Sequence, residues 1–134
     1  MPYAVRRAVA VIGATLGAVT ATAVVAAPAH AATVITGTVE AGAGLNVHSG
    51  SPTGVVIDTM PGGSRARIYC WTTGPTVSAT WGGGTWTTNI WDTVDGYTTP
   101  SGQTISFVGG TRVYASDAWI DTGGNTAQLI KKPC

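Results

Sequence analysis

Charge is scarce in this chain: only 10% of its 134 residues are charged. Residues 32–134 contain six acidic and five basic side chains, which gives a net charge of −1, and no basic run occurs among them. Proteins that bind nucleic acid or anionic membranes by electrostatic attraction need a basic patch. The composition therefore argues against both partners.

Cysteine and histidine are also rare. After residue 31 the chain has Cys70, Cys134 and one histidine, His48, and their spacing matches no metal-ligand pattern. We therefore expect no metal and no cofactor. Two thiols allow one intramolecular disulfide, which would close a long loop and fix the end of the chain. An intermolecular bridge and free thiols are the alternatives.

Helical periodicity is absent after residue 31, whereas apolar and polar residues often alternate. Short alternating segments between glycine- and proline-rich turns predict an all-β fold, a small barrel or a sandwich. Residues 95–110 are expected to form a long loop or a projecting hairpin, and residues 116–120 a tight turn. The predicted strands are Val34–Glu40, Leu45–His48, Val55–Met60, Arg65–Trp71, Val77–Trp81, Asn89–Val94 and Arg112–Ala115.

One predicted strand shows its two faces clearly. In Arg65–Trp71, Ala66, Ile68 and Cys70 fall on one side, which we assign to the core. Trp71 falls on the other side with the charged residues. This places Cys70 where a structural disulfide is expected.

The first 31 residues are typical of a secretory signal. Arg6 and Arg7 precede an uncharged, weakly apolar stretch that ends in Ala29-His30-Ala31, a small-residue cleavage pattern. We expect cleavage after Ala31 and one domain over residues 32–134. The alternative to a cleaved signal is an uncleaved membrane anchor. The alternative to the general secretory route is twin-arginine export. The mature product is expected to be a monomer, secreted or associated with the cell wall, with no membrane attachment.

Four segments, in order, carry a family resemblance: GTVEAGAGLNVHSG, VVIDTMPGGSRARIYC, NIWDTV and VYASDAWI. Together they resemble the bacterial SH3-type domains of secreted and wall-associated proteins, over most of residues 37–134. The cysteine positions are similar to those of an actinobacterial variant with one disulfide. The resemblance implies a small SH3-like barrel, here with an extended hairpin or loop at residues 95–110. It also implies binding to peptidoglycan. His48 stands where the family usually has arginine, and Ser51-Pro52 is out of step with its Gly-Pro turn.

Tryptophan is abundant, with five residues after position 31. A small barrel can bury about two of them, because each buried indole N–H also needs a hydrogen-bond acceptor. We expect Trp91 and Trp119 in the core and at least one of the others on the surface, where exposed indoles indicate a binding site. The alternative is that all five merely cover a thin core. The predicted ligand groove consists of Trp91 with one or more of Trp71, Trp81 and Trp86, and of Asn46, His48 and Asp92 as polar contacts.

Catalytic patterns are missing. His48 has no nucleophile or orienting carboxylate at a recognisable spacing, and no pattern around Asp92 and Asp95 indicates the environment that acid–base chemistry requires. Gly82-Gly83-Gly84-Thr85 lacks the lysine and the following helix of a phosphate loop. Ser116 and Asp117 are expected to cap the turn that follows them.

The sequence predicts a non-enzymatic binding module, and the family resemblance implies that this module binds peptidoglycan, specifically its peptide part. Two alternatives remain open. One is a secreted effector or inhibitor that binds a protein through residues 95–110, and the other is a polysaccharide binder that uses its exposed tryptophans.

Overall fold

The computed structural model describes residues 34–124, 126–130 and 133–134. The expected signal segment, residues 1–31, lies outside the described residues. The elements are β1 (Ile35–Val39), β2 (Leu45–Ser49), β3 (Val55–Met60), β4 (Arg65–Trp81), β5 (Gly84–Thr98), β6 (Thr104–Ser106), β7 (Val113–Ser116), the 3-10 turn η4 (Asp117–Trp119), β8 (Ile120–Asp121) and the single-turn helix α4 (Thr126–Leu129).

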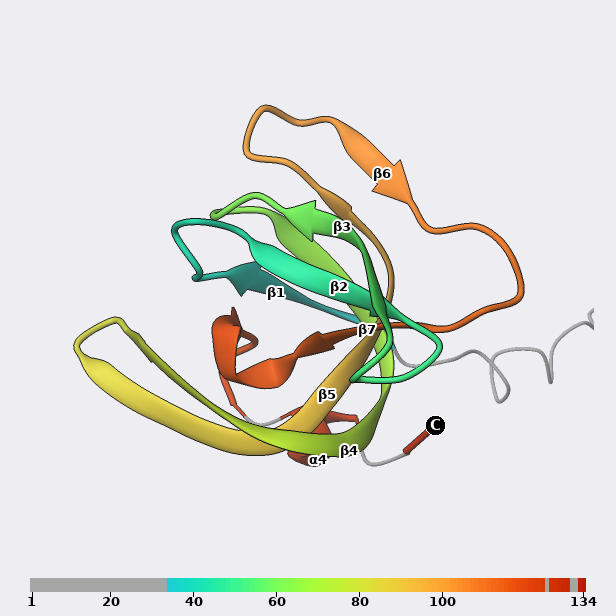
Figure 1. Ribbon diagram of the computed structural model, residues 1–134. Coiled ribbons are helices and arrows are strands. Elements are labelled where there is room, and N and C mark those ends of the chain that lie inside the picture. Colours follow the sequence, from blue (N-terminus) through green and yellow to red (C-terminus); the bar gives the residue numbers. More distant parts are fainter. Residues whose placement is uncertain (1–33, 125, 131–132) are drawn as a thin grey trace, which may run out of the picture. The chain divides into compact units, whose positions relative to one another are not determined.

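All the strands of the described chain belong to one antiparallel sheet, so the prediction of an all-β fold is confirmed. Their order is β3-β2-β7-β5-β4-β1-β8, and β6 pairs with β5 beside this path. Strands β3 and β8 form the two ends of the order and do not pair with each other, so the sheet is not closed. Figure 1 shows how strongly the sheet curves between these ends.

The longest feature is the hairpin of β4 and β5, a long curved arm in Figure 1. The sequence pattern predicts separate strands at Arg65–Trp71 and Val77–Trp81, but β4 runs through both. The pairing with β5 is irregular between Thr73 and Val77, and this irregularity absorbs the Gly74-Pro75 break without ending the strand. Likewise β5 begins at Gly84, five residues before the predicted start at Asn89.

The tip of this hairpin is a two-residue turn at Gly82 and Gly83. Their φ angles are +59° and +80°, which side chains other than glycine rarely adopt. Tight hairpin turns with two such residues match the right-handed twist of the flanking strands. The turn therefore fixes the register in which Ala79 lies opposite Trp86.

The remaining predictions of local structure are largely confirmed. Residues 95–110 form a hairpin, in which β6 pairs with the end of β5. Residues 116–120 contain the predicted tight turn, η4, and the Ser116 hydroxyl accepts a hydrogen bond from the Ala118 N–H at 3.3 Å. Ser116 is thus the predicted cap. The helical turn α4 was not predicted, because four residues are too few to show a helical period.

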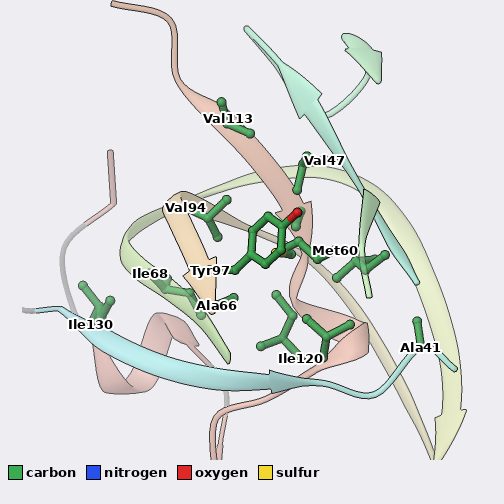
Figure 2. Packing of buried hydrophobic residues seen from close by; sticks show 13 residues of the cluster. Ala41, Val47, Met60, Ala66, Ile68, Val94, Tyr97, Val113, Ile120 and Ile130 are labelled. Carbon is green, nitrogen blue, oxygen red and sulfur yellow. The ribbon is translucent and has the colours of Figure 1, made fainter. Parts of the chain in front are cut away.

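The core lies within the curve of the sheet and draws residues from most of its strands (Figure 2). Ala66 and Ile68 are fully buried and Cys70 is 7% exposed, so the predicted core face of β4 is correct. Tyr97 lies among the aliphatic side chains and donates a hydrogen bond from its hydroxyl to Asp58 Oδ2 at 2.9 Å. Ile130, just after α4, completes the cluster.

The predicted disulfide between Cys70 and Cys134 is present, and no free cysteine occurs in the described chain. It attaches the last residue to β4, and the Cys134 N–H donates to the carbonyl oxygen of Trp71 at 2.8 Å. The Thr93 hydroxyl lies 2.8 Å from Cys134 Sγ. The end of the chain is therefore held by a covalent bond and by contacts with both long strands.

Candidate functional site

The tip of the β4–β5 hairpin and the segment from Asp117 to Gly124 enclose a pocket of about 650 Å³. We call it the indole pocket, because Trp81 and Trp86 form one of its walls. Its volume lies within the range of small-ligand sites. Ala118 and Ile120 line the pocket, as do Asp117 and Asp121.

The two indoles of this wall are stacked on each other. Their ring centroids are 4.9 Å apart and the ring planes are inclined by 29°. Trp81 Nε1 donates to the Ala118 carbonyl oxygen at 2.8 Å, which ties the hairpin tip to η4. Trp86 Nε1 donates to the Trp81 carbonyl oxygen at 3.2 Å, yet the Trp86 side chain remains 46% exposed. The wall is therefore both held in place and open to a ligand.

The acidic side of the pocket is built on η4 and β8. Asp117 is 7% exposed, and its Oδ1 accepts a hydrogen bond of 2.6 Å from the Thr126 hydroxyl of α4. Asp117 was predicted to cap the turn together with Ser116, but its side chain instead connects η4 to α4. Asp121 is exposed and accepts a hydrogen bond from the Gly123 N–H at 3.0 Å.

A second carboxylate, Asp92, lies behind Asp117. It is completely buried and interacts with the side chains of Asp117 and Thr126. Burial, together with the nearby negative charge of Asp117, raises the pKa of Asp92 well above its usual range. Burial likewise raises the pKa of Asp117, although the hydrogen bond from Thr126 opposes this shift. The two acids form a pair in which full ionisation is unfavourable.

Asp92 was predicted to contact a ligand directly, but it lines neither the indole pocket nor the second pocket described below. Its perturbed environment was not predicted either. The cause is tertiary: β7, η4 and α4 cover this part of β5 and exclude water from the carboxylate.

The second pocket, of about 370 Å³, brings together Asn46, His48 and Trp91 from the predicted groove. The rings of His48 and Trp91 meet edge to face at 5.5 Å. Trp91 is only 6% exposed, and its Nε1 donates to the Pro75 carbonyl oxygen at 2.9 Å. His48 Nδ1 lies 2.9 Å from the Gly54 carbonyl oxygen. The Trp91 indole of this pocket is therefore nearly buried, whereas Trp86 of the indole pocket is exposed.

The predicted groove is therefore divided between two places. Trp91 is in the core as expected, while Trp119 is only partly buried and lines the second pocket. Trp71 was predicted on the face opposite the core, but it packs against the core and its Nε1 donates to the Ile130 carbonyl oxygen at 2.7 Å. The strand pairing is irregular between Ile68 and Cys70, just before this residue, and Trp71 lines neither pocket. Trp86 is the exposed indole that sequence analysis expected among Trp71, Trp81 and Trp86.

The described part of the chain has no group of three or more histidine, cysteine, aspartate or glutamate side chains that could hold a metal ion. Among its helices, none has the length and apolar character to span a membrane. The indole pocket presents aromatic faces and carboxylates.

Fold and site thus define a disulfide-bridged, all-β protein with an aromatic pocket at a hairpin tip. No family model matches the chain, and no solved structure matches it. The chain is 38% identical over 88 residues to the uncharacterized protein YraI of Bacillus subtilis (strain 168), an alignment that covers 64% of this chain and 70% of that protein. The chain belongs to the same family as this Bacillus protein.

Proposed function

We propose that residues 32–134 act outside the cell as a non-enzymatic binding module with an SH3-type fold, which attaches to cell-wall peptidoglycan through its peptide part. The indole pocket is the ligand site in this proposal. It replaces the single groove around Trp91 that the sequence suggested.

The observation that carries the proposal is the stack of the exposed Trp86 on the partly buried Trp81 beside a pocket of about 650 Å³. A large aromatic surface left open to water is unfavourable for a free protein, and such surfaces mark binding sites. Flat rings suit the backbone and the aliphatic parts of a short peptide. Trp81 is bonded to η4, so little order has to be gained on binding.

The arrangement of the motif segments supports the SH3-type part of the proposal. The LNVHS segment is β2, the VVIDTM segment is β3, the NIWDTV segment is in β5 and the VYAS segment is β7. These four strands are neighbours in the order β3-β2-β7-β5. The Cys70–Cys134 disulfide is compatible with the oxidising conditions outside the cell.

Co-sedimentation with purified cell walls tests the function. We expect the protein to pellet with native walls and to stay in solution with walls stripped of peptide. Trp86→Ala should abolish most of the binding. The matched control is Val108→Ser, which changes a side chain that is 90% exposed and outside both pockets.

Three results would contradict the proposal. If the protein does not pellet with native walls, wall binding is wrong. Equal binding to stripped walls would favour the polysaccharide alternative. Loss of binding in the Val108 variant but not in the Trp86 variant would move the contact surface to the 95–110 hairpin and away from the indole pocket.

A further inference from the structure

The residues that line the indole pocket combine aromatic faces with negative charge. Trp81 and Trp86 supply the faces, Asp117 and Asp121 supply two carboxylates, and none of the described lining residues is basic. A negatively charged peptide or a phosphate would be repelled by this surface. A cation would be attracted both by the carboxylates and by the negative face of the indole rings.

We propose that the indole pocket recognises an aliphatic ammonium group, placed against the Trp81–Trp86 stack and paired with Asp117. This deepens the proposed function and rests on it for the source of the group, the free side-chain amine of a diamino acid in the wall peptide. The aliphatic stem of such a side chain would lie along the indole faces, and its charged end would reach the acidic side.

The pocket carboxylate Asp117 has a fully buried acidic neighbour, Asp92, with which it interacts directly. Ionising both carboxyls in this buried position is costly, so the free pair retains protons. An ammonium group at Asp117 would offset the negative charge of the pair.

The charged groups around this position come from three elements. Asp92 belongs to β5, Asp117 to η4 and Asp121 to β8, and the Thr126 hydroxyl of α4 donates to Asp117. Burial raises the pKa values of Asp92 and Asp117, so the pair retains protons into a higher pH range than free aspartate does. A bound ammonium group favours the ionised form, and we expect it to lower both pKa values.

Two small probes test the inference without cell walls. One is Nα-acetyl-L-lysine N-methylamide, which carries an ammonium group, and the other is the same compound acetylated on Nε, which is neutral. Titration is followed by the intrinsic fluorescence of the indoles and by isothermal calorimetry. We expect the charged probe to bind at least about tenfold more tightly than the neutral one.

Two carboxylate variants locate the binding. Asp117→Asn keeps an oxygen that can accept the Thr126 hydrogen bond but loses the charge. This variant should lower the affinity for the charged probe at least about tenfold. Asp95→Asn is the matched control, because it makes the same charge change at a residue that pairs with Arg67 and lines neither pocket. It should leave binding unchanged. Circular dichroism with thermal unfolding checks that each variant is folded.

Equal binding of the two probes, or no binding of either, would overturn the inference. So would an equal loss in the Asp95 and Asp117 variants. Walls whose free amines have been acetylated separate this inference from the proposed function. Undiminished pelleting with acetylated walls would refute the ammonium site and leave wall binding in place. Binding of the charged probe without pelleting on native walls would refute wall binding and retain the ammonium site.

Discussion

Removing the Cys70–Cys134 disulfide should destabilise the domain by about 4 kcal/mol. The two residues are 64 positions apart, and the chain-entropy model assigns about this much stabilisation to a loop of that length. A domain of this size is stable by only about 5–15 kcal/mol, so the loss is a large share of the total. When the disulfide is removed, three hydrogen bonds near the end of the chain should also weaken. They are the bonds from the Cys134 N–H to the Trp71 carbonyl oxygen, from the Trp71 indole to the Ile130 carbonyl oxygen, and between the Thr93 hydroxyl and Cys134 Sγ.

The measurement is urea unfolding of the oxidised protein, the reduced protein and the Cys70→Ser/Cys134→Ser variant, followed by tryptophan fluorescence. Reduced protein and variant should show similar losses, because both lack the covalent bond. A loss below about 1 kcal/mol in both would refute the reasoning, since the chain end would then be held by its packing alone. A large loss in the variant but not in the reduced protein would assign the effect to the serine substitutions at a buried position.

Three further predictions concern the core, a loop and the buried acids. Ile68→Ala, at a fully buried position, should lower the free energy of unfolding by about 2–5 kcal/mol in urea titrations, and a change below about 1 kcal/mol would contradict its place in the core. Gly54→Ala should lower the melting temperature, because a Cβ there would lie 1.8 Å from the Ser49 carbonyl oxygen, and an unchanged melting temperature would show that the loop can shift. The raised pKa values of Asp92 and Asp117 mean that the folded state holds protons that the unfolded state releases above about pH 4, so stability should fall as the pH rises from 4 towards the folded pKa values. Asp92→Asn should reduce this fall in unfolding experiments at pH 4 to 7, and an unchanged pH profile would contradict the assignment.

Local sequence patterns were sufficient for most of the secondary structure. Alternation in Arg65–Trp71 identified the buried face of β4, since side chains of a strand point alternately to its two sides. The hairpin turn at Gly82 and Gly83 is also local, because glycine readily adopts the positive φ angles of that turn. The continuation of β4 through Gly74-Pro75 could not be read from those residues, because pairing with β5 along both sides of the irregularity holds the strand together.

The candidate site was only partly predictable. The surplus of tryptophans over what a small core can bury indicated exposed indoles, and Trp86 is one. The stacking of Trp86 on Trp81 follows from the hairpin register and could have been found from the glycine turn. The acidic side of the pocket could not, because Asp117 and Asp121 lie about 30 residues or more from the indoles in sequence.

By itself, the sequence determined the all-β character, the single disulfide partner for Cys70 and the presence of more indoles than the core accommodates. These properties depend on composition and on contacts between near neighbours in the chain. Only the tertiary structure decided which indoles are open, that Asp92 is buried beside Asp117, and that the predicted groove is two separate pockets. Burial and the pairing of charges depend on which distant segments the sheet brings together. The strand order and the pairing register that bring them together are set by the whole fold.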